Sequence, residues 1–308
     1  MRVYSHRFRL STAQADRLAG GAARWAHVWI NRVTDKDNHS LGFMSRDPSG
    51  WILDMELPAD ILASYSFSAG SSARPSRLMP WDVTRDRILQ GPQAPDTREF
   101  TVATSQPTTQ RTVAGRRVDY FLPSGATTLL TVFDGADWFD RVNLPGALMA
   151  AGLPVAVVGI TPRDRADRQA TLGWHPEFLR HVQDGIVPLA GSFPRHVVAG
   201  QSLGGIAALC AVQPGFLWDH ALAQSPSLWW SPDNQTNPGH WSEQPNDWVA
   251  SQLAPDTPAW TQAGSLEGLM PHRVRKLGLS YREFTGGHDL AWWRVGLLDY
   301  LRHVGAAG

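Results

Sequence analysis

Short apolar runs alternate with amphipathic or small-residue stretches from about residue 108 to the end of the chain. The apolar runs predict buried strands, expected at 127–133, 154–160, 196–199, 220–224, 259–263 and 279–284. The stretches between them predict helices, expected at 143–151, 175–189, 203–212 and 293–303. Regular alternation of this kind implies a parallel sheet covered by helices on both faces. We therefore predict an α/β domain over residues 108–308.

The first hundred residues show a different pattern. Strand-like runs at 26–30, 51–55 and 64–67 are short and are separated by clusters of turn residues. Such spacing predicts a small all-β domain, an Ig-like sandwich. Residues 90–107 are rich in Gly, Pro, Thr and Gln, which is typical of a linker. We therefore expect an N-terminal β-sandwich domain with its linker over residues 1–107.

Composition narrows the class of protein. The 28 basic and 28 acidic side chains cancel, which argues against a nucleic-acid partner. At 43% hydrophobic residues the chain can bury a substantial core, so it is not disordered. The single cysteine, Cys210, excludes an intramolecular disulfide and a cysteine-based zinc site. No apolar run reaches the ~20 residues of a membrane-spanning helix, and the N-terminus lacks the apolar core of a secretory signal. We expect a cytoplasmic protein with no membrane partner.

The motif with the clearest chemistry is the G-x-S-x-G sequence centred on Ser202. It joins a predicted apolar strand to a predicted helix, which is the context of a nucleophile elbow in an α/β-hydrolase. The glycines beside Ser202 remove Cβ atoms where strand and helix crowd a strained turn. The pattern alone arises by chance, but its position predicts that Ser202 is a catalytic nucleophile.

A nucleophilic serine needs a base, and chain order indicates which histidine supplies it. In α/β-hydrolases the order is serine, acid, histidine, with the histidine after the last strand. His288 is the one histidine of eleven in that position, and Gly286-Gly287 before it form a flexible turn. The acid is expected after the penultimate strand, where Glu267 lies. Asp256 precedes that strand, and Asp289 is expected to cap the last helix.

Two backbone amides are candidates for an oxyanion hole. The N–H of Leu203 is expected at the N-terminus of the helix after Ser202, where a developing negative charge is stabilised. The second N–H is expected from the loop after the first central strand, at Gly135. An alternative interpretation of this loop is a plain strand-to-helix turn with Asp137 as the N-cap. The two interpretations are compatible.

These motifs together resemble those of the enterochelin esterases. The segments that carry the resemblance are Phe133-Asp134-Gly135-Ala136-Asp137-Trp138, 200–205 (GQSLGG), 224–230 (QSPSLWW) and 286–294 (GGHDLAWWR), with 31–35, 57–60 and 64–67 near the N-terminus. One stretch of the enterochelin esterase pattern, at residues 168–175, differs in this chain. Arg168 is kept, but Thr171 and His175 stand where the family has Glu and Asn. The resemblance covers nearly the whole chain and implies a hydrolase for the trilactone backbone of a catecholate siderophore.

The resemblance also implies how the substrate is held. A ferric or iron-free catecholate carries negative charge and aromatic faces, which suit Arg168, Trp138, Trp229 and Trp230. Each has a second interpretation, an ion pair for the arginine and core packing for the tryptophans. The polar loop 31–38, with Arg32, is expected to form a wall of the substrate site. No cofactor or metal is expected beyond the iron of the substrate. A general carboxylesterase or feruloyl-type esterase and a non-catalytic siderophore-binding protein are the alternative functions.

Overall fold

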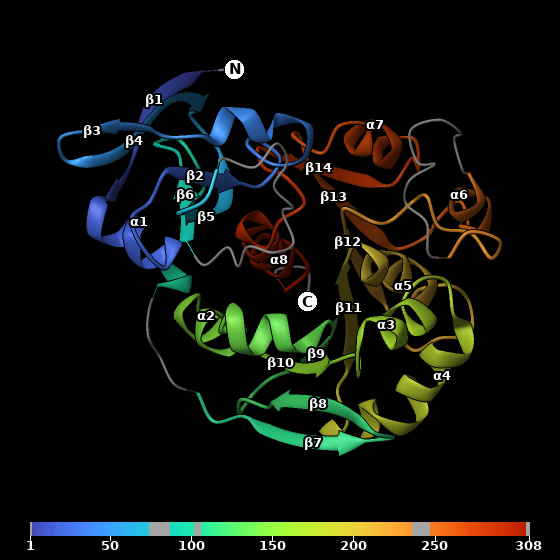
Figure 1. Cartoon of the computed structure of the whole chain (residues 1–308). Helices are drawn as coiled ribbons and strands as arrows, with labels where there is room; N and C mark the ends of the chain where they lie inside the picture. The colour runs from blue at the N-terminus through green and yellow to red at the C-terminus, as the bar shows by residue number, and fades with distance from the viewer. Residues whose placement is uncertain (1, 74–86, 102–105, 236–246, 306–308) are drawn as a thin grey trace. The chain divides into compact units, whose positions relative to one another are not determined.

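A computed structural model describes residues 2–73, 87–101, 106–235 and 247–305 (Figure 1). Contacts along the backbone divide the chain into two compact units. The first comprises Met1–Asp96, Gly264–Gly268 and Phe284–Trp292. The second comprises Thr97–Ala263, Leu269–Glu283 and Trp293–Gly308. The predicted linker contains the change from one unit to the other, whereas two short later segments return to the first unit. The domain boundary at residue 107 stays a prediction.

An eight-stranded sheet forms the framework of the second unit, in the order β14-β13-β12-β11-β9-β10-β8-β7. Strands β9 to β13 pair in parallel, while β8 and β7 are antiparallel to their neighbours. The bounds are β7 Thr109–Val113, β8 Arg116–Phe121, β9 Thr128–Phe133, β10 Val155–Ile160, β11 Arg195–Gln201, β12 His220–Gln224, β13 Ala259–Gly264 and β14 Ser280–Phe284. This mostly parallel sheet confirms the predicted α/β class. The sequence did not predict β7 and β8. β7 is an exposed edge strand without an apolar run, and charged residues interrupt the apolar residues of β8.

Helices cover both faces of this sheet, α2 and the body of α8 on one face and α3 to α5 on the other (Figure 1). The bounds are α2 Leu144–Ala150, α3 Arg165–Thr171, α4 Pro176–Gly185, α5 Leu203–Ala211, α6 Trp248–Gln252, α7 Met270–Arg275 and α8 Leu290–Gly305. Every residue of α5 is buried, which its small and apolar sequence permits. The helix predicted at 175–189 ends earlier, at Gly185, and continues as a 3-10 turn, Val187–Ala190, that contains Pro188. Proline lacks the N–H that would continue an α-helix.

Two antiparallel three-stranded sheets build the first unit, in the orders β1-β4-β3 and β2-β5-β6. The bounds are β1 Val3–Ser11, β2 Trp25–Ile30, β3 Ser45–Asp47, β4 Gly50–Pro58, β5 Leu62–Gly70 and β6 Arg87–Gln90. Both sheets contribute to one hydrophobic core, for example through Phe8 and Val28. A helix, α1 (Thr12–Ala19), adds to the predicted all-β part. Its capping box, in which Ser11 and Gln14 bond each other's backbone, is a sequence signal that the strand pattern did not capture.

The two short C-terminal segments of the first unit are bonded to each other, and the second of them, 284–292, is also bonded to β5. The N–H of Leu62 donates to Thr285 O at 2.9 Å, and the N–H of Leu266 donates to Gly286 O at 3.0 Å. Residues 264–268 and 284–292 are therefore fixed on the N-terminal sheets, although they lie some 200 positions later in the chain. Among the described residues, no helix combines the length and hydrophobicity needed to cross a membrane.

Candidate active site

Ser202 forms a strained turn between β11 and α5. Its backbone has φ 58° and ψ −121°, which a residue with a Cβ rarely adopts. A Cβ on Gly200 would overlap with the carbonyl oxygen of Gly204, so glycine is required where strand and helix cross. This is the strand, turn and helix arrangement of a nucleophile elbow. The Ser202 side chain is half-buried.

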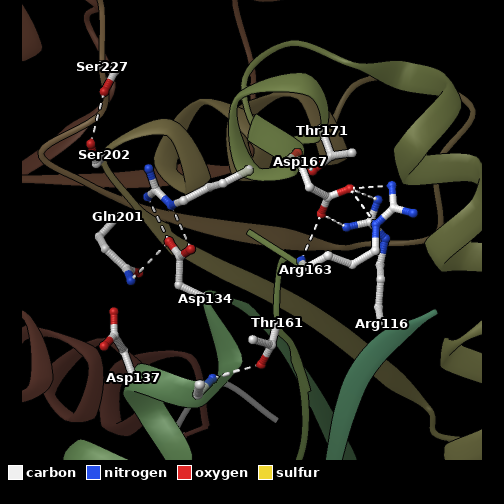
Figure 2. A network of polar contacts seen from close by, with 12 residues as sticks. Arg116, Asp134, Asp137, Thr161, Arg163, Asp167, Thr171, Gln201, Ser202 and Ser227 are labelled. Carbon is white, nitrogen blue, oxygen red and sulfur yellow. Dashed lines mark hydrogen bonds and ion pairs between the residues drawn. The ribbon is translucent and has the colours of Figure 1, made fainter. Parts of the chain in front are cut away.

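Ser227 is bonded to Ser202 through both side chain and backbone (Figure 2). The two Oγ atoms lie 3.1 Å apart, and the N–H of Ser227 donates to Ser202 O at 3.0 Å. Ser227 is almost fully buried. No sequence pattern assigned a role to Ser227, although it stands within the 224–230 segment of the family resemblance. No local pattern predicts that two serines 25 positions apart share a hydrogen bond.

The candidate oxyanion residues lie in contrasting surroundings. Leu203 is the first residue of α5, where a helix leaves N–H groups without intrahelical partners. A Cβ on Gly135 would lie 2.6 Å from the carbonyl carbon of Gly159 on β10, so this position accepts only glycine. Asp137 is not the N-cap that the alternative interpretation assigned. It begins a π-helical turn and accepts a hydrogen bond from Arg141, while the Asn143 side chain caps α2. The oxyanion roles of Leu203 and Gly135 stay predictions.

An ion pair lies beside the nucleophile elbow. Arg168 donates from Nε and Nη2 to the two carboxylate oxygens of Asp134, at 2.7 Å each. Gln201 Nε2 also donates to Asp134, at 3.4 Å (Figure 2). Burial lowers the pKa of Arg168, but the hydrogen bonds and charge of Asp134 outweigh that effect and raise it overall. The Arg168 charge is therefore offset by a carboxylate of the same unit, and its contact with a substrate stays a prediction.

A second charged cluster fixes the start of α3, the helix that carries Arg168 (Figure 2). The carboxylate of Asp167 accepts hydrogen bonds from the guanidinium groups of Arg116 and Arg163 and from the Arg163 N–H. Burial raises the pKa of Asp167, but the two arginines more than compensate and lower it to about 2. Thr171 donates its hydroxyl proton to Asp167 O at 2.7 Å. This cluster holds α3 at its first turn.

Within the first unit, His288 pairs with Glu267. The Nδ1–H of His288 donates to Glu267 Oε2 at 2.8 Å, and the Glu267 side chain is 1% exposed. The other carboxylate oxygen, Oε1, accepts the N–H of Gly264 at 3.0 Å. Of the acidic residues weighed from the sequence, Glu267 is the one that the structure bonds to His288. Asp256 is exposed in the turn before β13. The roles of His288 and Glu267 in catalysis stay predictions.

Asp289 bonds other partners. Its Oδ2 accepts the N–H of Ser64 at 2.5 Å and the Ser64 hydroxyl at 2.8 Å. Its Oδ1 accepts the N–H of Ala291 at 3.0 Å, in the first turn of α8. Asp289 therefore caps this helix, as the sequence predicted, and it also ties the His288 segment to β5.

The predicted polar loop of the N-terminal part contacts the same segment. Asn31 Nδ2 donates to the carbonyl oxygen of His288 at 3.1 Å. A Cβ on Gly287 would overlap with Asn31 Oδ1 and would lie 2.5 Å from Arg32 Cγ. Arg32 has φ 60° and its N–H donates to Asp35 Oδ1 at 3.0 Å. The role of Arg32 in anion binding stays a prediction.

The three candidate tryptophans differ in accessible surface. Trp138 is 0% and Trp230 is 2% exposed, whereas Trp229 is half-buried. The Trp230 ring packs edge-on against His175, with centroids 5.4 Å apart. Trp138 and Trp230 therefore contribute to the core, and of the three Trp229 has surface for a ligand ring. Contact of any of them with a substrate stays a prediction.

Comparison with protein families gives one match that covers most of the second unit. The family model Esterase, described as "Putative esterase", matches residues 109–304. The iron(III) salmochelin esterase of Escherichia coli O6:H1 (strain CFT073) is 31% identical over 336 aligned positions, which cover 89% of this chain and 82% of that protein. An iron(III) enterobactin esterase of the same strain is 30% identical and covers 79% of this chain and 66% of its own length.

Solved structures with the same fold extend over nearly the whole chain. The enterobactin esterase of Shigella flexneri, crystallised in the presence of enterobactin, has a TM-score of 0.76 at 22% identity. The ferric enterobactin esterase of Salmonella typhimurium has a TM-score of 0.75 at 21% identity. Each alignment covers 97% of this chain and 92% of the solved chain. These likenesses show that both parts of the fold, the N-terminal sheets and the large α/β sheet, occur together in other proteins.

Proposed function

Because this chain belongs to the esterase family whose model matches residues 109–304, we propose that it is a serine esterase for catecholate siderophores. The family assignment agrees with the resemblance drawn from the sequence motifs. The proposed substrate is the trilactone backbone of a ferric or iron-free catecholate siderophore. Its main support is the 31% identity with an iron(III) salmochelin esterase over 89% of the chain.

The strained turn at Ser202 carries the proposed chemistry. A serine held at positive φ between a strand and a buried helix has little use in a binding protein, but it exposes a nucleophile in a hydrolase. The three proposed catalytic residues follow the carboxyl ends of strands of one sheet, Ser202 after β11, Glu267 after β13 and His288 after β14. Their order along the chain is that of α/β-hydrolases.

In the proposed mechanism, His288 Nε2 accepts the Ser202 proton as Oγ attacks an ester carbonyl. Glu267, bonded to Nδ1–H, orients the imidazole and stabilises its protonated form. The amides of Leu203 and Gly135 donate to the tetrahedral oxyanion. The alkoxide leaves with the proton from His288, and a water molecule then releases the acyl group by the same steps in reverse order.

Substrate binding is proposed to use charge and aromatic contact. Arg32 and Arg168 attract the anionic catecholate, and the accessible surface of Trp229 offers a face to a catechol ring. The iron arrives and leaves as part of the siderophore, and the reaction needs no cofactor. We also propose that the enzyme acts in the cytoplasm, without a nucleic-acid or membrane partner.

A product analysis tests this proposal. The purified chain is incubated with iron-loaded and iron-free enterobactin, and product masses are recorded beside turnover of a small chromogenic ester. We expect addition of water to the trilactone, and loss of about 10⁶ in kcat in Ser202→Ala with siderophore binding retained. Turnover of the chromogenic ester alone would indicate a general carboxylesterase. Siderophore binding without turnover would indicate a binding protein, and either outcome contradicts the proposal.

A further inference from the structure

The segment that carries His288 is attached to the N-terminal sheets at several points. The N–H of Leu62 and the carboxylate of Asp60 bond Thr285, before the histidine. Asn31 bonds the carbonyl oxygen of His288 itself. From these contacts we propose that Asn31 is a positioning residue for His288, and that the N-terminal sheets form part of the catalytic apparatus. This inference rests on the proposed function, in which His288 is the base.

Asn31 occupies a fixed place in its own unit. It directly follows β2, and its backbone N–H donates to Ser64 O on β5 at 3.2 Å. The turn after it is closed by Thr34, whose hydroxyl accepts the N–H of Ile30 and donates to Val28 O, both at 2.7 Å. Asn31 is 8% exposed. These bonds fix the backbone of Asn31, and its side chain points toward the segment that carries His288.

The fit between Asn31 and that segment is close. Gly287 has no Cβ, and there is no space for one, because Asn31 Oδ1 and Arg32 Cγ occupy its place. The backbone at residues 287 and 288 therefore rests directly on the turn after β2. A hydrogen bond of 3.1 Å from Asn31 Nδ2 to His288 O fixes the distance between this turn and the backbone of His288.

A second anchor lies one residue beyond the histidine. Asp289 Oδ2 accepts two hydrogen bonds from Ser64, and both residues are buried. His288 thus stands between two bonds to the β2-β5 sheet, while Glu267 holds its imidazole. A base must keep its geometry to within about 0.5 Å for efficient proton transfer. A segment in non-helical, non-strand conformation gains that precision from such anchors.

This role is distinct from that of a substrate wall. A wall grips the outer part of a bulky siderophore, so its loss would raise KM for that substrate and spare a small ester. A positioning residue acts on the base, so its loss lowers kcat for every ester. A displacement of about 1 Å at a reacting group can cost about 100-fold in rate.

The test uses the full chain with Asn31→Ala and a matched control, Gln93→Ala, which removes an exposed amide from the segment after β6. The kcat and KM are measured with a small chromogenic ester, and thermal denaturation reports folding. A third measurement is the rate of inactivation by diisopropyl fluorophosphate. In that reaction Ser202 Oγ bonds to phosphorus, the P–F bond breaks, fluoride leaves and the serine proton passes to His288. This rate reports the activation of Ser202 without a siderophore.

For Asn31→Ala we expect kcat to fall by about 10- to 100-fold, with KM within about twofold of the wild type. The inactivation rate should fall by a similar factor, while Gln93→Ala keeps wild-type values. Unchanged kcat, or a loss confined to KM or to the siderophore, would overturn the inference. If Asn31→Ala does not fold, Ser64→Ala serves instead. It removes the hydroxyl bond to Asp289 but keeps the backbone bond, and it should lower kcat by a smaller factor.

The design separates this inference from the proposed function. A folded wild-type chain that is inert to esters and to diisopropyl fluorophosphate would refute the proposed function. An active wild type with a fully active Asn31→Ala variant would refute only the positioning role.

Discussion

Ser227 Oγ lies 3.1 Å from the Oγ of Ser202, and the backbones of the two residues are also bonded to each other. The hydroxyl of a nucleophilic serine can rotate about χ1, and only one of its staggered positions suits attack on a given carbonyl. Ser227 is buried, so its own side chain has little freedom. The pair therefore holds Ser202, the proposed nucleophile, in one orientation before the substrate arrives.

We predict that Ser227→Ala lowers kcat toward a small ester by about fivefold, the worth of one hydrogen bond. KM and thermal stability should change little, because the methyl group of alanine fills most of the same space. Ser280→Ala, at an exposed position on β14, is the matched control. A Ser227→Ala enzyme with wild-type kcat would show that the contact has no part in orienting Ser202.

The structure also separates the roles of the acidic residues beside His288. Glu267→Gln should lower kcat by about 10⁴, and His288→Ala by about 10⁶, because the orienting acid contributes less than the base. Both variants should retain the wild-type unfolding temperature to within a few degrees. The measurement is steady-state turnover of a chromogenic ester. A Glu267→Gln variant with full activity would exclude this carboxylate as the third member of the triad.

Asp289→Asn provides the contrast to Glu267→Gln. Asp289 accepts hydrogen bonds from three donors on its two oxygens, and an asparagine offers one acceptor oxygen. We therefore expect Asp289→Asn to lower the free energy of unfolding by about 1–3 kcal/mol. Denaturant titration measures this change. A loss of stability in Glu267→Gln but not in Asp289→Asn would reverse these assignments.

Local motifs carried most of the sequence-based prediction. The elbow at Ser202 was predicted from a motif of five residues. Glu267 and His288 were predicted from their order along a chain in which strands and helices alternate. The apolar runs located β9 to β13 because strands buried on both faces leave a continuous hydrophobic signal. The polar edge strand β7 leaves no such signal, and the capping box of α1 is a short-range signal of another kind.

The contacts that support the site are of long range. Asn31 and His288 are 257 positions apart, and Ser64 and Asp289 are 225 apart. Neither asparagine nor serine has a periodicity or spacing that relates it to a residue at such a distance. The same holds for Arg168, whose partner Asp134 lies 34 positions away. Sequence patterns predict elements and their order, whereas the pairing of polar side chains between elements depends on the packed structure.

We predict that the buried carboxylate of Asp167 makes the free energy of unfolding depend on pH. Its pKa, about 2 in the folded chain against an ordinary value of 3.8, is lowered by Arg116 and Arg163 despite burial. A lowered folded pKa stabilises the fold fully above the unfolded pKa, and that stability is lost as the pH falls from about 4 toward 2. Asp167→Asn should destabilise the chain by about 3 kcal/mol at pH 7, because Arg116 is left buried without its carboxylate.

Denaturant titrations of wild type and Asp167→Asn at pH 7, 4 and 3 measure this linkage. The gap in unfolding free energy should be constant between pH 7 and about 5 and should narrow below pH 4. Asp184→Asn, at an exposed position of α4, should show no such gap. A gap that stays constant to pH 3 would mean that the Asp167 carboxylate is not held ionised by its arginines.

Arg32 gives a final prediction that separates substrate binding from catalysis. Its side chain lies against Gly287, one residue from the proposed base, and it is half-buried on a turn with φ 60°. Arg32→Gln keeps the Cβ and Cγ atoms that lie against Gly287 but removes the charge. We expect KM for a ferric catecholate trilactone to rise by about tenfold, the value of one hydrogen bond to a charged group. The kcat for a small neutral ester should stay at the wild-type value.

Salt screens exposed charges, so the KM difference between Arg32→Gln and the wild type should shrink as ionic strength rises. Arg24→Gln, exposed just before β2, is the control for a change in net charge. Equal effects on the anionic and the neutral substrate would show that Arg32 does not bind the siderophore by its charge. A KM difference that does not change with ionic strength would show the same.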